Sequence, residues 1–192
     1  MKVFKISTLA KPPQGRYRDY AGLGVSEKDS AYVREVGSGR PFPTEWHPIQ
    51  LWIDTPHWPR PDIYAFGPGA FVCSDRVVEL LGEPLEMAGE LLPITIEGES
   101  GNFFVYNVTN SKNVFDTEKA TWRINGPLRH IVKYAFKAER FGEESLFKIP
   151  EDCDIDIYCL ERTGNADEGE FKALVERHQL TGIEFELVWT DE

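Results

Sequence analysis

The stretch FKALVERHQLTGIEFELVW, residues 171–189, places a helical pattern directly before a strand pattern. Asp167, with Glu170 three residues later, has the spacing of a helix N-cap and its capping box. The apolar face of the predicted helix then recurs at helical spacing through Phe171, Leu174, Val175 and His178. Gly182 can adopt the left-handed conformation that follows many helix ends. The sequence therefore predicts a capped helix that ends just before Gly182.

Beyond Gly182 the pattern changes to a period of two. The residues Ile183, Phe185, Leu187 and Trp189 alternate with Glu184, Glu186 and Val188. Successive side chains of a strand point to opposite faces, so this alternation predicts a strand with one buried face. We expect Phe185, Leu187 and Trp189 to be buried. Their burial would contribute on the order of 5 kcal/mol before the entropy of ordering is counted.

Composition limits the class of protein. The chain has 192 residues, 41% of them hydrophobic and 12% aromatic, which favours one globular domain with a β-rich core. The 32 acidic and 21 basic residues give a net charge of -11. This charge repels nucleic acid and anionic membranes and attracts cationic partners, so we expect neither nucleic-acid nor membrane binding. Acidity for solubility alone would give the same composition.

The location expected from the sequence is the cytoplasm. Cys73, Cys153 and Cys159 are an odd number of cysteines without C-x-x-C spacing, which is typical of a reducing compartment. The N-terminal residues lack the apolar core of a signal peptide, and no apolar run is long enough to span a bilayer.

The order of elements predicts an α+β fold with a largely antiparallel sheet and helices packed on it. Residues 3–8 form the first expected strand, and the rest of residues 1–60 are loop-rich, with short strands expected at 32–36 and 49–53. Ser74 is the expected N-cap of a helix that ends at Gly82. Further strands are expected at 91–96, 103–108, 119–124, 131–137, 145–149 and 155–160.

No motif of catalysis or cofactor binding stands out. The four histidines, His47, His57, His130 and His178, lack chelating spacing with each other or with the cysteines, so we expect no metal and no cofactor. Ser74 lacks the glycines of G-x-S-x-G, and helix capping explains it better than nucleophilic catalysis. We therefore expect a protein that is not an enzyme. An enzyme with dispersed active-site residues remains the less favoured alternative.

Two groups of residues are candidates for binding a partner. Asp152, Asp154 and Asp156 would form an acidic ridge on one face of a strand, and Glu97 and Glu99 would add to the acidic surface. A merely solvated face is the alternative reading of such a row.

Trp58, next to His57 in a proline-rich loop, is a candidate hot spot, because flanking prolines reduce the entropy that an exposed side chain loses on binding. Ordinary packing of Trp58 over the sheet is the alternative.

An ordered set of motifs between about Pro61 and Trp189 resembles the eleventh immunity-protein family of bacterial polymorphic toxin systems. The motifs are Pro61-Asp62-Ile63, Phe71-Val72-Cys73-Ser74-Asp75-Arg76-Val77 with Leu80-Leu81, Gly89-Glu90-Leu91-Leu92-Pro93, Tyr106-Asn107-Val108 with Asp116, Leu146-Phe147-Lys148-Ile149, and Leu180-Thr181-Gly182-Ile183-Glu184-Phe185. The resemblance implies a protein that binds the C-terminal domain of a cognate secreted toxin, often a nuclease, and protects the producing cell. It implies no catalytic residues. A regulatory or scaffolding domain with another protein partner is the alternative, and the neighbouring gene would separate the two.

Overall fold

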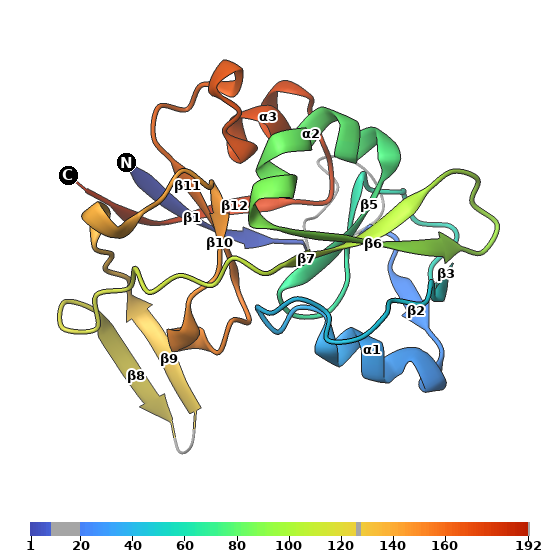
Figure 1. The fold of residues 1–192 in the computed structure, drawn as a ribbon, viewed down its shortest axis with the longest axis horizontal. Helices are drawn as coiled ribbons and strands as arrows, with labels where there is room; N and C mark the ends of the chain where they lie inside the picture. Colours follow the sequence, from blue (N-terminus) through green and yellow to red (C-terminus); the bar gives the residue numbers. More distant parts are fainter. Residues whose placement is uncertain (9–19, 126–127, 192) are drawn as a thin grey trace.

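The computed structural model describes residues 1–8, 20–125 and 128–191. These residues form three α-helices and twelve strands in mostly antiparallel sheets, which confirms the predicted α+β class. Figure 1 shows two sheets side by side, with helices both above and below them and a separate hairpin that projects away from the body.

The larger sheet has six strands in the order β2-β3-β6-β7-β5-β4. Neighbouring strands are antiparallel except β3 and β6, which are parallel. Its strands are β2 (Leu23–Val25), β3 (Gln50–Ile53), β4 (Ile63–Ala65), β5 (Ala70–Ser74), β6 (Gly89–Ile96) and β7 (Phe103–Val108). The strands predicted at 49–53, 91–96 and 103–108 are confirmed.

The smaller sheet has four antiparallel strands in the order β10-β11-β1-β12, so β1 lies between two strands from the C-terminal part of the chain. They are β1 (Lys2–Ser7), β10 (Leu146–Phe147), β11 (Ile157–Glu161) and β12 (Glu184–Thr190). The projecting hairpin consists of β8 (Thr121–Asn125) and β9 (Leu128–Lys133). The strand predicted at 131–137 is therefore shorter than expected and begins earlier in the chain.

The helices are α1 (Ser30–Glu35), α2 (Asp75–Ala88) and α3 (Phe171–Arg177), with short 3-10 helices η1 (Glu27–Asp29), η2 (Ala138–Arg140), η3 (Pro150–Asp152) and η4 (Ala166–Glu168). The strand predicted at 32–36 is wrong, because these residues lie in and just after α1. Ser74 is the N-cap of α2, although its side chain makes no capping hydrogen bond. The helix passes Gly82, whose φ of 29° and ψ of -109° produce a kink, and continues for six more residues instead of ending there.

The start of α3 also differs from the prediction. Asp167 lies in η4, and Glu170 is the N-cap residue. The carboxylate of Glu170 does not close a capping box; it accepts hydrogen bonds from the backbone N–H groups of Arg162, Thr163 and Gly164. The left-handed conformation of Gly182 is confirmed by its φ of +90°. A Cβ atom there would lie 2.0 Å from the carbonyl oxygen of Ile63, so the position requires glycine.

β12 contains a bulge that changes which residues are buried. Leu187 pairs with Phe4 and Trp189 pairs with Val3, so Val188 is an extra residue on β12. Directly paired residues share a face, and Val3 and Phe4 point to opposite faces, so Trp189 and Leu187 also point to opposite faces. Leu187 is 52% exposed, and the prediction that it is buried is wrong. Phe185 and Trp189 are half-buried.

Three apolar clusters form the core. The first core lies between the two sheets and helices α2 and α3, and it contains Phe4, Phe71, Leu81, Tyr106 and Phe171. The second core lies on the other face of the larger sheet, under α1 and its loops. The third core lies between the smaller sheet and the base of the hairpin, and Trp189 packs against it. The first core joins both sheets into one packed unit.

Candidate partner-binding surfaces

The structure brings two of the predicted candidate groups together. The loop that carries His57 and Trp58 meets the turn between β6 and β7 through an ion pair of 3.1 Å between Arg60 Nε and Glu99 Oε1. His57 and Glu97 are exposed, whereas Trp58 is half-buried against the second core. Trp58 therefore packs over the sheet, and an ion pair already neutralises Glu99.

The predicted acidic ridge does not exist as a row on a strand. Asp152 ends η3, and β11 begins only at Ile157. Between them Cys153 and Asp154 have φ values of 65° and 57°, a left-handed pair that turns the chain and breaks the alternation. Tyr158 has the strand parity of Asp154 and Asp156, and it is fully buried, so these positions do not form one solvated face. The prediction failed because the alternation of Asp and Ile also fits a turn.

Each of the three aspartates has a partner within the chain. Tyr158 donates its hydroxyl to Asp152 Oδ2 at 2.6 Å, Ser111 donates to Asp154 Oδ1 at 2.6 Å, and Lys5 Nζ lies 2.6 Å from Asp156 Oδ2. Burial raises the pKa of Asp152 to about 6, although the hydrogen bond from Tyr158 acts in the opposite direction. The three residues thus contribute less free negative charge than their sequence indicates.

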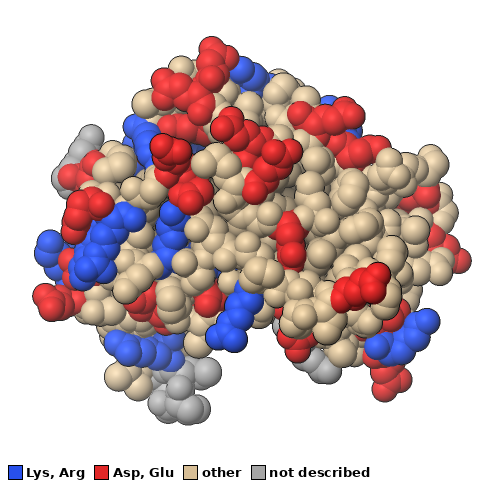
Figure 2. Space-filling model, viewed as in Figure 1, with Lys and Arg blue, Asp and Glu red and all other residues tan. Residues whose placement is uncertain are grey.

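A more strongly acidic surface lies between α2 and η4. We define the acidic cleft by Glu83, Glu143 and Glu168, which line a cavity of about 300 Å³ together with Met87 and Arg162. Among the described residues, none of these three glutamates has a cation within 4.0 Å. Met87 is 41% exposed. Figure 2 shows Asp and Glu side chains gathering over the α2 and α3 end of the molecule.

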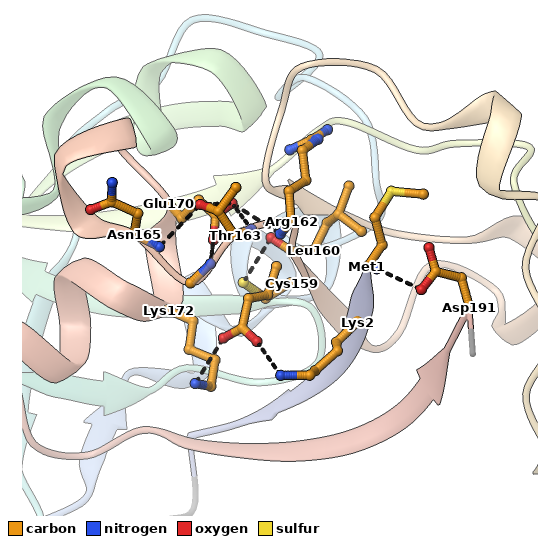
Figure 3. Close-up of polar contacts among 12 residues, drawn as sticks. Met1, Lys2, Cys159, Leu160, Arg162, Thr163, Asn165, Glu170, Lys172 and Asp191 are labelled. Atoms are coloured by element: carbon orange, nitrogen blue, oxygen red, sulfur yellow. Dashed lines mark hydrogen bonds and ion pairs between the residues drawn. The ribbon is translucent and has the colours of Figure 1, made fainter.

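Hydrogen bonds and ion pairs brace the elements behind the acidic cleft. The carboxylate of Glu170 holds the 162–164 turn through its three backbone N–H groups, as Figure 3 shows. Glu161 accepts from Lys2 at 3.1 Å and from Lys172 at 3.0 Å, which links β11 to β1 and α3. Burial acts to raise the pKa of Glu161, but these two hydrogen bonds hold it below its ordinary value. These contacts hold β11, the 162–164 turn and α3 in place behind the acidic cleft.

A second concave surface lies between the hairpin and the turn after η3. We define the β9 groove by Arg129, His130 and Ile131 on one wall and Glu151, Asp152 and Ile155 on the other; its volume is about 530 Å³. Tyr134 and Trp122 also line it, and the guanidinium of Arg129 lies 3.8 Å from the centre of the Trp122 ring.

Three buried polar atoms belong to residues of the β9 groove. Trp122 Nε1, Glu151 Oε2 and Asp152 Oδ1 are buried without a partner at hydrogen-bond geometry in the described part of the chain. Most buried polar atoms in proteins are paired, so a concentration of unpaired ones marks this groove as unusual.

Sequence reasoning missed the acidic cleft and found only Asp152 and Asp156 of the β9 groove, because each surface assembles from segments far apart in the chain. Glu83, Glu143 and Glu168 come from α2, the segment after η2, and η4. No local pattern connects them. Met87 is an exposed residue in the second half of α2. The sequence predicts that this helix ends at Gly82, so it gives Met87 no place on a helix surface.

Within residues 1–8, 20–125 and 128–191, no group of three or more His, Cys, Asp or Glu side chains is arranged to hold a metal ion. Cys73 and Cys159 are buried, and burial raises the pKa of each thiol to about 12, so neither is a thiolate near neutral pH. No described helix combines the length and apolar character needed to cross a bilayer.

No protein-family model matches the chain, and no curated protein matches it significantly. The resemblance to the immunity-protein family gains no support from these comparisons and stays a prediction.

Proposed function

We propose that this chain is an immunity protein of the cytoplasm that binds the C-terminal domain of a cognate secreted toxin and neutralises it without catalysis. The observation that carries the proposal is the acidic cleft, where three glutamates without ion-pair partners among the described residues line one cavity together with an exposed methionine. The order of motifs between Pro61 and Trp189, which resembles an immunity family, gives the biological context.

The charge of the cleft suits a basic partner. Among the described residues, three carboxylates without direct ion pairs outnumber the one cation of the cleft, Arg162, and complementary fields accelerate association at low salt. Met87 would supply a flexible apolar contact beside the charged groups, and protein interfaces commonly combine apolar contacts with polar surroundings. In this proposal the carboxylates of the cleft increase the association rate, and the apolar contact of Met87 lengthens the lifetime of the complex.

The test uses the purified chain and the C-terminal domain encoded by the adjacent open reading frame. We expect the double variant Glu83→Lys with Glu143→Lys to slow association by about tenfold or more at low salt, and the difference to shrink as salt rises. The matched control is Glu27→Lys with Glu118→Lys, because these glutamates are also exposed and form no ion pair within the described residues. Both pairs change the net charge equally.

Two results would count against the proposal in different ways. If the wild-type chain does not bind the toxin domain and does not protect cells that express it, the immunity function is rejected. If both double variants slow association equally, only the net charge matters and the acidic cleft is not the interface.

A further inference from the structure

One wall of the β9 groove is a free strand edge. In the two-stranded sheet of the hairpin, β9 is paired with β8 alone. Arg129, His130 and Ile131 are consecutive residues of β9, and all three line the groove. Successive side chains of a strand point to opposite faces, so a groove that touches three in a row follows the edge of the strand. Figure 1 shows β8 on one side of β9 and the rest of the molecule on the other.

An exposed apolar side chain lies in the groove beside this edge. Ile155 is 51% exposed, and it lines the groove together with Ile131 of β9. A free edge with an apolar side chain beside it can accept another strand, with main-chain hydrogen bonds to the edge and side chains in adjacent pockets.

The charges of the two walls select the kind of occupant. Arg129 and His130 lie on the strand wall, and Glu151 and Asp152 on the opposite wall, without an ion pair to a described residue. Nucleic acid or an anionic membrane would meet the repulsion of Glu151 and Asp152. A second copy paired through β9 would place Arg129, His130 and Lys133 against the same residues of the other copy, which like-charge repulsion disfavours.

We propose that the β9 groove binds an extended segment of a partner protein, which adds to the free edge of β9 as a third strand. The backbone N–H and C=O groups of that segment pair with the free edge of β9, and an apolar side chain of it packs against Ile131 and Ile155, which both line the groove. The identity of the partner as a toxin rests on the proposed function, whereas the mode of binding does not.

The first test measures the complex with the toxin domain from the adjacent open reading frame. We expect hydrogen–deuterium exchange at the amides of residues 128–133 to slow when the complex forms. Ile155→Arg should weaken binding by about tenfold or more, as expected for an apolar side chain that the partner covers. Leu187→Arg is the matched control, because Leu187 is 52% exposed but lies on β12, outside the groove, and it should leave the affinity within about twofold. Thermal melting establishes that both variants are folded.

If the toxin domain binds while residues 128–133 exchange unchanged and Ile155→Arg has no effect, the groove proposal is overturned and the immunity function stands.

A second experiment tests whether the β9 groove binds an extended segment even when the toxin domain does not bind. A displayed library of linear seven-residue peptides is selected on the wild-type chain and then tested on the two variants. Peptides that bind the wild type and Leu187→Arg, lose binding to Ile155→Arg and protect residues 128–133 from exchange would support strand addition. No enrichment, or peptides insensitive to Ile155→Arg, would reject it.

Discussion

Lys148 is a fully buried lysine that ties the segment after α1 to the core. Its ammonium donates to the carbonyl oxygen of Gly37 at 2.6 Å, while the amide oxygen of the buried Asn107 accepts from the N–H of the same glycine at 2.9 Å. Burial lowers the pKa of Lys148 to about 8. Burying this ammonium costs free energy, and its hydrogen bond to Gly37 offsets part of that cost and fixes the position of residues 36–42.

This geometry makes the stability depend on pH through Lys148. Its pKa is about 8 in the folded state, whereas an unperturbed lysine has a pKa of 10.5, so between these pH values the unfolded state binds more protons and the wild type gains stability as pH rises. We expect the free energy of unfolding of the wild type, relative to Lys148→Met, to increase by up to about 3 kcal/mol between pH 7.5 and 10.5. Buried thiols and tyrosines also titrate there, but they cancel in the comparison. Urea unfolding of both proteins at several pH values measures this difference in stability. A difference that does not change with pH would contradict the lowered pKa of Lys148.

Asp152 gives the opposite dependence at acidic pH. Its pKa is raised from 3.8 to about 6, so between these values the folded state binds more protons and stability falls as pH rises. Asp152→Asn removes this titration and keeps an oxygen that can accept from Tyr158. We expect the variant to gain about 1–2 kcal/mol relative to the wild type between pH 4 and 6.5. Denaturant melts across this range test the expectation, which a constant difference between the two proteins would refute.

At the scale of the element, the bulge in β12 assigns different roles to Leu187 and Trp189. Trp189 lies 5.7 Å from Phe136 and 6.3 Å from Phe141, measured between ring centroids, whereas Leu187 is exposed on the other face. We expect Trp189→Ala to destabilise the protein by about 2–3 kcal/mol and Leu187→Ala by less than about 1 kcal/mol. Equal losses in equilibrium unfolding would show that β12 pairs with β1 without the bulge.

The elements also show what the sequence could and could not predict. Strands with simple alternation, such as Leu91–Ile96, were predicted within two residues because one face of each is buried. The bulge at Val188 and the turn at Cys153 and Asp154 were not predicted. The alternation of apolar and polar residues is the same in the sequence whether or not a strand contains a bulge or a left-handed turn. Glu170 was taken for a capping residue because its spacing from Asp167 fits, yet its partners lie in the preceding turn.

At the scale of the whole molecule, the first core predicts cooperative unfolding. Phe4 and Ile157 of the smaller sheet share this cluster with Phe71 and Tyr106 of the larger sheet. Neither sheet can open without exposing apolar surface of the other, so we expect one transition. Far-ultraviolet circular dichroism and tryptophan fluorescence should give coincident urea curves, and the slowest amides of β1 and β7 should open with the same free energy. Separate transitions for the two sheets would contradict this.

The candidate surfaces mark the limit of sequence reasoning at this scale. A net charge of -11 predicted an acidic surface, but ion pairs and hydrogen bonds engage Glu99 and Asp156, whereas Glu83 and Glu143 have no ion pair among the described residues. Which carboxylates remain unpaired depends on contacts between segments distant in the chain. The composition predicts that the electrostatic potential of the protein is negative. The fold determines where on the surface the unpaired carboxylates lie.

The position of β1 between β11 and β12 has a consequence for the order of events during protein synthesis. Lys2 pairs with Glu161 on one side and Thr190 on the other, so β1 leaves the ribosome long before either of its neighbours in the sheet. At a translation rate of about 5–20 residues per second, β1 waits for roughly ten to forty seconds before its second neighbour is made. Meanwhile Val3, Phe4 and Ile6, all buried in the finished sheet, remain uncovered by it. The nascent chain therefore passes through an interval in which a chaperone that holds apolar segments would raise the yield of folded protein.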